Sequence, residues 1–163
     1  MSPDPAPDAD HAVNARAVCA RARVGALSTL AREPAGFPYG SIVELAFDER
    51  GRPILLLSRL AEHTQNLLAR PEASIVVFDA KSESVMASAR VTLLGPCAPI
   101  LEPSEARAAR ELYLAAHANA RVYADFADFG FYRLEPVAIR YIGGFGKMSW
   151  VSSEAYSSKT GIS

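Results

Sequence analysis

The chain has 163 residues, of which 50% are hydrophobic and 21% charged, and this composition is ordinary for one globular domain. Its formal net charge of −1 provides no basic field, so we expect neither nucleic acid nor a membrane as a partner. The longest apolar runs are only as long as a strand, and the N-terminal MSPDPAPDAD lacks the basic and apolar regions of a secretory signal.

The first nine residues are rich in Pro and Asp, and this composition predicts a disordered tail. Residues 10–156 are then expected to form a single domain, followed by a flexible C-terminal tail at 157–163. Cys19 and Cys97 do not have the spacing of a metal site, so we expect two buried thiols and no metal. Unpaired thiols are typical of a reducing compartment, and a cytoplasmic location is therefore expected.

Three helices are predicted from their end signals and the spacing of their apolar residues. Asp10 can cap the first helix, Pro71 stops the second, and Pro103 starts the third. The helices are expected at 11–23, 60–69 and 103–118.

Stretches rich in β-branched and apolar residues predict the strands of one sheet. Residues 41–47 alternate with period two, DERG at 48–51 supplies a hairpin turn, and the apolar run at 54–57 predicts a strand buried on both faces. The remaining strands are expected at 26–30, 74–78, 85–94, 129–134 and 137–142. Because hairpins dominate, we predict a mainly β (α+β) fold, an antiparallel barrel of six to seven strands with covering helices.

The densest polar cluster, SRLAEHTQNLLARP at 58–71, directly follows the most apolar strand. At helical spacing Arg59, His63, Asn66 and Arg70 share one stripe. A helix start offers unpaired N–H groups and the positive end of the helix dipole, so this segment predicts a site for an anion, above all phosphate. The alternative is a solvated helix face with a serine cap, in which His63 is a surface residue.

Two further features lie in the second half of the chain. Arg90 precedes an apolar stretch, and it is either a second cation for the same anion or a charge at a strand edge. The glycines of YIGGFGKMSW, 141–150, do not have the spacing of a nucleotide fingerprint. The stretch predicts either an ordinary bulge at a barrel corner or a bulge that admits a planar group between Phe145 and Trp150, with Lys147 as a charge.

Together these stretches resemble the pyridoxamine 5′-phosphate oxidase-like, FMN-binding split-barrel superfamily, and within it the branch of haem-utilisation and haem oxygenase-like proteins. The resemblance is carried by ALSTL, GFPYGSIVEL, DERGRPILLLSRLAEHTQNLLARPEASIVVF, ARVTLLG and FGFYRLEP…RYIGGFGKMSWV, which span about residues 24–151. It implies a split β-barrel, FMN as the cofactor, and a homodimer with its sites at the interface.

The resemblance also implies which residues contact the cofactor. The GSIVEL strand would lie along the isoalloxazine ring and ribityl chain, the SRLAEHTQNL segment would hold the phosphate, and the C-terminal lysine would approach from the partner subunit. It implies no catalytic residue. The implied cofactor-binding residues are Ser41, Ile42, Val43, Ser58, Arg59, Leu60, His63, Thr64, Arg90 and Lys147.

The sequence departs from the family pattern in several places. Glu62 and His63 stand where the oxidase proper has an Arg-Lys pair, and no Arg-x-His pattern follows residue 140, so vitamin B6 oxidation is not expected. The haem-degrading relatives use a histidine near the C-terminus as the axial ligand, whereas the last histidine here is His117. The extra C-terminal domain of some proteins in that branch is not evident either.

The leading hypothesis is therefore an FMN-binding flavoprotein, an oxidoreductase whose small-molecule substrate and electron donor are unassigned. Because no HExxH or GxSxG motif occurs, the bound flavin would carry the electrons. Two alternatives stay open: a haem-binding or haem-degrading split-barrel protein, and a non-enzymatic binding or regulatory module.

Overall fold

The structure is a computed structural model that describes residues 7–79, 84–144 and 146–158. Helix α1 (Pro7–Arg21) begins inside the stretch expected as a disordered tail, and the rest of that tail lies outside the described residues. The other helices are α2 (Glu62–Ala69), α3 (Pro103–Ala116), the 3₁₀ helix η1 (Ala118–Val122) and α4 (Ser153–Ser157). The strands are β1 (Val24–Leu30), β2 (Pro38–Glu44), β3 (Ala46–Phe47), β4 (Pro53–Ser58), β5 (Glu72–Phe78), β6 (Arg90–Pro99), β7 (Phe129–Leu134), β8 (Ala138–Ile142) and β9 (Met148–Val151).

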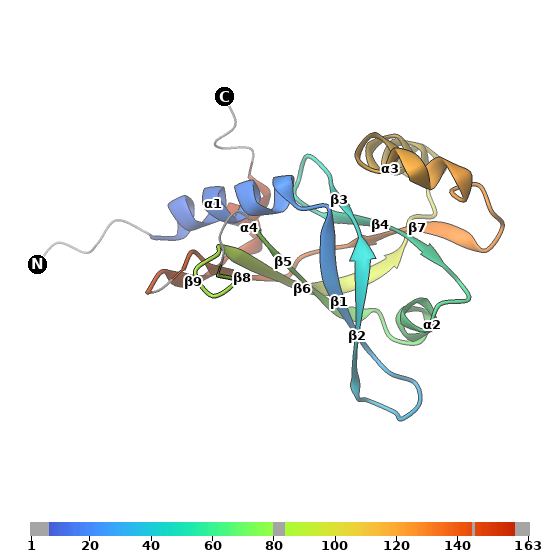
Figure 1. The fold of residues 1–163 in the computed structure, drawn as a ribbon, viewed down its shortest axis with the longest axis horizontal. Coiled ribbons are helices and arrows are strands. Elements are labelled where there is room, and N and C mark those ends of the chain that lie inside the picture. Colours follow the sequence, from blue (N-terminus) through green and yellow to red (C-terminus); the bar gives the residue numbers. More distant parts are fainter. Residues whose placement is uncertain (1–6, 80–83, 145, 159–163) are drawn as a thin grey trace, which may run out of the picture.

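In the described part of the chain, these strands form one curled antiparallel sheet (Figure 1). The main path has the order β2-β1-β5-β6-β7-β4-β3, and β8 connects β6 to β9. Strand β6 belongs to both halves of the sheet, because it pairs with β5 over residues 90–96 and with β7 over 97–99. The fold is a β-rich half-barrel with covering helices, which confirms the predicted class.

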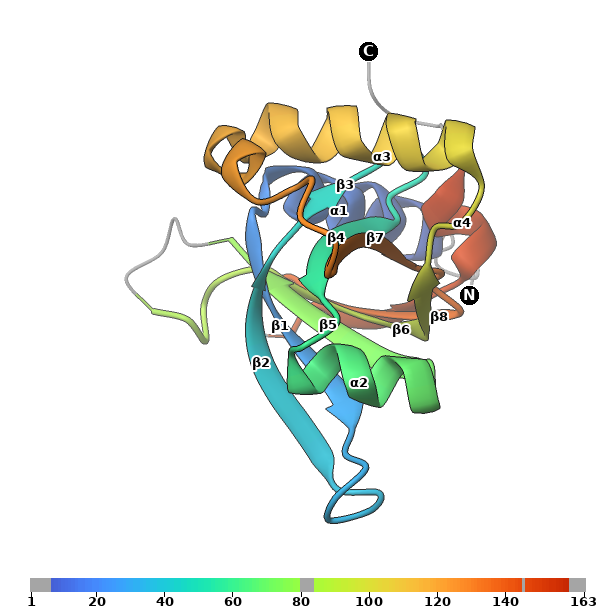
Figure 2. The ribbon, with the colours of Figure 1, turned by 90° about the vertical axis from the view of Figure 1, so that its right-hand side faces the viewer.

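Strand β4 lies between two hydrophobic clusters, and its sequence PILLLS explains how. Successive side chains of a strand point to opposite faces, so an uninterrupted apolar run can serve two cores at once. Leu55 and Leu57 belong to the larger cluster inside the barrel, which α1 and α4 also join. Ile54 and Leu56 belong to the smaller cluster beneath α3. Figure 2 shows α3 on one side of β4 and β7 and α2 on the other.

The turn between β3 and β4 is fastened to the helices beside it. The Asp48 carboxylate accepts hydrogen bonds from the backbone N–H groups of Arg50 and Arg52, at 2.9 Å each. Gly51 has a φ of +77°, and its carbonyl accepts from the hydroxyl of Tyr156 in α4 at 2.8 Å. Arg16 of α1 also donates to this turn, at the carbonyl of Glu49. The predicted hairpin is thus present, and it is held by both terminal helices.

Most other predicted bounds differ from the structure by a few residues, and some elements differ in more than their ends. The expected strand 41–47 divides at Leu45, because the chain pairs with β1 up to Glu44, and the Leu45 N–H still donates to the Arg23 carbonyl in that register, whereas from Ala46 it pairs with β4. The expected strand 85–94 begins only at Arg90, because the residues before it form a turn in which the Ser88 N–H donates to Ser84. The glycine-rich stretch forms a β8–β9 hairpin rather than a bulge, with the Gly143 N–H donating to Lys147. Helix α4 was not predicted.

No helix in the described ranges is both long and apolar enough to cross a membrane.

Candidate functional site

A cleft of about 350 Å³ lies where the edge strand β2, the end of β4 and the start of α2 approach α3. Its walls are mainly apolar or aromatic, with a histidine toward one end and a carboxylate toward the other. Because Ile42 and Glu44 are two residues apart on a strand, they face the same side of the sheet. The lining residues are Ile42, Val43, Glu44, Leu56, Leu57, Ser58, Ala61, His63, Tyr113, Tyr123 and Phe129.

His63 stands at the α2 end of the cleft and is bonded to β2. Its Nδ1 lies 3.1 Å from the hydroxyl oxygen of Ser41, and its Nε2 has no hydrogen-bond partner among the described residues. Burial lowers the pKa of His63, so its ring is neutral near neutral pH. A neutral imidazole with one nitrogen fixed and the other unbonded is the form that binds metal ions. This contact joins the polar segment at 58–71 to the GSIVEL strand.

The turn that precedes α2 is held by a partner that sequence reasoning did not identify. The Ser58 hydroxyl donates to the Asp128 carboxylate at 2.6 Å, and its oxygen accepts from the Leu60 N–H. The N-cap of α2 is Ala61, which makes no side-chain cap, so the alternative of a serine cap at Ser58 is wrong. The guanidinium of Arg59 donates to the Ala127 carbonyl at 2.9 Å. The β4–α2 turn is therefore anchored to the segment that leads into β7.

The opposite end of the cleft carries an acidic and aromatic group. His117, the C-cap of α3, donates from Nε2 to the Leu45 carbonyl at 2.8 Å, and its Nδ1 lies 3.9 Å from the Glu44 carboxylate. The ring of Tyr113 packs against the His117 ring with 4.7 Å between centroids. Burial raises the pKa of Tyr113, and neighbouring Tyr123 and Glu44 raise it further, so the phenol stays protonated. The Nε2 of His117 is thus bonded to the backbone, and its Nδ1 faces the Glu44 carboxylate.

The structure brings five of the ten predicted contact residues to the cleft or its edge. These are Ser41, Ile42, Val43, Ser58 and His63. Leu60, 83% exposed, and Arg59 lie on the adjoining surface, outside the lining.

The other three predicted residues lie elsewhere in the chain. Thr64 is fully buried on the inner side of α2 and is not among the residues that line the cleft, and its hydroxyl has no partner among the described residues. Arg90 begins β6, three strands from β2 and so about 14 Å away along the sheet. Its guanidinium donates to the carbonyls of Met86 and Ser88, and Arg90 begins an inner strand, where β5 and β8 pair with it on both sides. Lys147 lies in the β8–β9 turn, and the expected aromatic wall Phe145 lies outside the described residues.

Sequence reasoning missed the aromatic and acidic side of the cleft. Tyr113 comes from α3, Tyr123 from the segment after it and Phe129 from the start of β7, and only the tertiary fold brings them to β2. Glu44 did carry a local signal, because it follows Ile42 by two residues on a strand already expected to face the cofactor.

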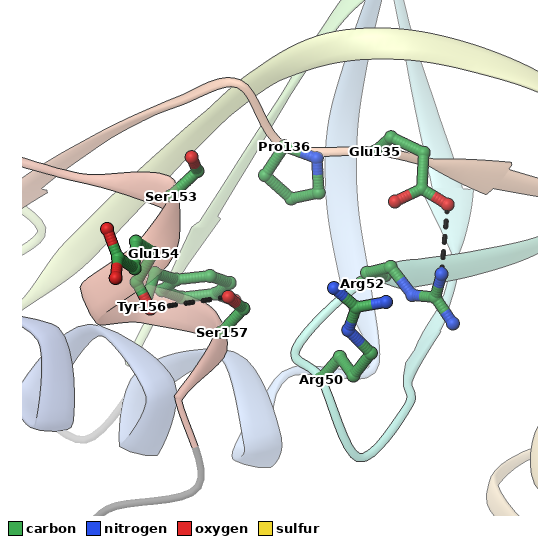
Figure 3. Close-up of a pocket in the computed structure, with 8 residues that line it drawn as sticks. All are labelled: Arg50, Arg52, Glu135, Pro136, Ser153, Glu154, Tyr156 and Ser157. Atoms are coloured by element: carbon green, nitrogen blue, oxygen red, sulfur yellow. Dashed lines mark hydrogen bonds and ion pairs between the residues drawn. The ribbon is translucent and has the colours of Figure 1, made fainter.

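A second cavity, of about 360 Å³, lies between the β3–β4 turn and α4 (Figure 3). Arg52 reaches across it to Glu135 at 3.0 Å and also donates to Asp48 at 2.8 Å. These partners, rather than a ligand, raise the pKa of Arg52 against the opposing effect of burial, which is the largest single influence. This cavity is therefore a polar gap between the β3–β4 turn and α4.

The described residues hold no cluster of three or more His, Cys, Asp or Glu side chains arranged for a metal ion. A bare metal site built by several protein ligands is therefore not seen in these ranges. The cleft does hold one histidine beside an apolar wall, and a planar metal cofactor that takes a single protein ligand could bind to such a surface.

Comparisons with known proteins give a consistent set of relatives. A family model described as CREG, beta-barrel matches residues 6–158. The chain is 42% identical over 120 residues to the chloroplastic haem oxygenase HOZ of Arabidopsis thaliana, covering 74% of this chain and 36% of that protein. The structure of a haem-binding protein from Mycobacterium smegmatis matches with a TM-score of 0.84 at 36% identity, covering 96% of this chain and 62% of that one.

A more distant solved structure shares the fold. ChuZ of Campylobacter jejuni matches with a TM-score of 0.76 at 16% identity, covering 94% of this chain and 63% of that one. At that identity the likeness concerns the fold alone. The chain spans less than two thirds of the length of each of these three relatives.

Proposed function

The chain belongs to the CREG β-barrel family, with the split-barrel fold of the pyridoxamine 5′-phosphate oxidase-like superfamily, and on this premise we propose that it binds haem in the cleft and takes part in haem breakdown. The observation that carries the proposal is the 42% identity to a protein named a haem oxygenase. The 36% identity to a protein named haem-binding supports the same ligand. Haem therefore replaces FMN as the leading hypothesis.

The residues of the cleft fit a haem. Leu56, Ile42 and Phe129 offer apolar surface to a flat macrocycle, and burial of such surface drives the binding of planar ligands. A neutral imidazole at the rim belongs to the class of side chain that binds haem iron. Bound haem would supply the iron at which dioxygen is activated, and the protein would bind and orient it.

FMN is the second candidate, and one observation favours it. The N–H groups of Glu62 and His63 at the start of α2 have no acceptor among the described residues, as in helix ends that bind phosphate. The charges nearby oppose it. Glu62 places a carboxylate at this helix end, its ion pair with Arg32 at 3.6 Å occupies one cation, and Arg59 is directed to a carbonyl. A phosphate dianion would therefore meet little positive charge.

We further propose that the chain is a homodimer with the cleft at the interface, and that it works in the cytoplasm. Several large apolar side chains near the cleft are exposed in the single chain. Ile42 is 73% exposed and Leu60 83%, and the loop after β1 adds Phe37. Exposed apolar surface of this kind is typical of an interface. The free, buried Cys19 and Cys97 support a reducing compartment.

The proposal is tested by titrating the purified apoprotein with haemin and, separately, with FMN. We expect a saturable Soret band with haemin, no tight binding of FMN, and loss of the haem spectrum when ascorbate and dioxygen are supplied. Tight FMN binding without a Soret band would instead support the flavoprotein hypothesis. If neither chromophore binds, the chain is better described as a binding or regulatory module.

A matched pair of variants locates the binding site. Ile42→Asp adds a carboxylate to the apolar wall, and burying a charge there is costly, so haem affinity should fall at least about 10-fold. Val137→Asp makes the same change at a side chain that is 66% exposed and outside the cleft lining, and affinity should not change. Equal affinities of the two variants would place the haem elsewhere. Light scattering of the same samples with and without haem tests the dimer.

A further inference from the structure

Haem bound in the cleft needs a protein ligand for its iron, and histidine commonly supplies one. The structure describes all three histidines, so each can be assessed as a ligand. His11 of α1 lies 2.6 Å through Nδ1 from Ser149 of β9 and packs against Tyr141, outside the cleft lining. His117 has Nε2 bonded to a backbone carbonyl and Nδ1 beside Glu44.

His63 differs from the other two in position, and from His117 also in bonding. It lines the cleft, it is partly buried, and its Nε2 has no partner among the described residues. We propose that His63 is the axial ligand of bound haem through Nε2 and that Ser41 positions its ring, an inference that rests on haem being the ligand of the cleft.

The hydrogen bond to Ser41 selects the tautomer that this role needs. A metal at Nε2 requires the proton to reside on Nδ1, and Nδ1–H then donates to the Ser41 oxygen 3.1 Å away. Ser41 is itself fixed, because it is paired with Leu27 in the β1–β2 ladder. Helix α2 fixes the other end of the histidine side chain. The ring is thus held from two elements, as in metal sites whose ligands are oriented by a hydrogen bond from the outer nitrogen.

Other side chains that bind haem iron are less well placed. Cys19 and Cys97 are buried in the main core, away from the cleft lining. Met86 and Met148 are exposed but outside that lining. Tyr113 and Tyr123 do line the cleft, so a phenolate is the competing ligand that the experiment must distinguish.

The test is resonance Raman and absorption spectroscopy of the ferrous haem complex, which report the iron–histidine bond without any activity measurement. The wild-type protein should show an iron–histidine stretching band. His63→Gly should lose that band and bind haem about 10- to 100-fold more weakly, and added imidazole should restore the band by filling the vacated space. His11→Gln, a histidine change outside the cleft, should leave the spectrum unchanged.

Ser41 is tested separately as a positioning residue. Ser41→Ala should keep the iron–histidine band but shift its frequency and weaken haem binding about 10-fold, because the ring loses its orienting partner. Ser41→Thr retains the hydroxyl and should restore the wild-type frequency. An unshifted band in Ser41→Ala would remove the positioning role.

The outcomes separate this inference from the proposed function. If wild-type protein binds haem and His63→Gly keeps an unaltered iron–histidine band, His63 is not the ligand while the proposed function stands. If the wild-type protein binds haem without an iron–histidine band, and Tyr123→Phe removes iron–phenolate bands from its ferric spectrum, a tyrosine is the ligand while the proposed function stands. If the wild-type protein binds no haem, the proposed function fails and this inference fails with it. Circular dichroism melting of each variant checks that the fold is intact.

Discussion

At the scale of single residues, the least expected feature is the buried amide of Asn66 in α2. Helical spacing placed it on a polar stripe with Arg59 and His63, yet Asn66 is fully buried. Its Nδ2 donates to the Thr29 hydroxyl at 3.0 Å, and its Oδ1 accepts from the Arg32 N–H at 3.2 Å. These two bonds tie the helix that carries His63 to the end of β1. A buried amide is tolerated because its groups are paired.

Asn66→Ala should therefore destabilise the protein by about 1–3 kcal/mol, because the Thr29 hydroxyl and the Arg32 N–H would lose their partner in a buried site. Leu68→Ala is the matched control on the same helix. Leu68 is 50% exposed, and its truncation should change the free energy of unfolding by only about 0.5 kcal/mol. Urea denaturation of both variants measures the difference. Equal effects would show that the amide bonds contribute nothing.

At the scale of elements, strands and helices with strong local signals could be predicted. The run ILLL within β4 has no polar residue and had to be buried on both faces, and Pro103 fixed the start of α3. Breaks caused by distant partners could not be predicted. The alternation of residues 41–47 continues through Leu45, but the structure divides the segment there, because the chain pairs with β1 up to Glu44 and with β4 from Ala46 onward. The polar SSEAYSS gave no sign of α4, which is held by burial of Tyr156.

The β3–β4 turn gives an element-scale prediction with an internal control. Gly51 and Gly36 both have positive φ, at +77° and +82°. A Cβ at Gly51 would lie 2.7 Å from the Tyr156 ring and 2.8 Å from Arg16, whereas one at Gly36 would meet nothing within 4 Å. Gly36→Ala should cost about 1 kcal/mol from backbone strain alone. Gly51→Ala should cost a further 1–3 kcal/mol or so from overpacking against α4.

Thermal denaturation of the two glycine variants provides the measurement. The melting temperature should fall clearly more for Gly51→Ala than for Gly36→Ala. If the two fall equally, the turn is not packed against Tyr156 and Arg16 as described.

At the scale of the whole molecule, β6 belongs to both halves of the sheet. Gly95 lies where its partner on one side changes, because β8 pairs with it up to Leu94 and β7 from Cys97. A Cβ there would lie 1.9 Å from the backbone oxygen of Glu135, a contact that no side-chain movement can relieve. The candidate site shows the same dependence on global folding. Ser41 and His63 could be named as site residues from their local sequence. The proximity of Glu44 to His117 could not, because it depends on α3 folding back over β2.

Gly95→Ala should therefore cost about 3 kcal/mol or more, because the backbone of β6 or of the β7–β8 connection must shift. Gly40→Ala is the control in β2, where a Cβ would meet nothing within 4 Å, and its effect should stay within about 0.5 kcal/mol. Chemical denaturation compares the two. A mild effect at Gly95 would mean that the two halves of the sheet can separate slightly at little cost.

Two hydrogen bonds, one from β2 and one from the residue just after it, connect this edge of the cleft to α2 and to the end of α3. Ser41 holds His63 of α2, and Leu45, four residues further along, holds His117 at the end of α3. Four residues of extended backbone measure about 13 Å, a length that side-chain substitutions hardly alter. The width of the cleft along this edge is therefore set by the backbone. A ligand wider than this can enter only if the hydrogen bond of His63 or that of His117 breaks.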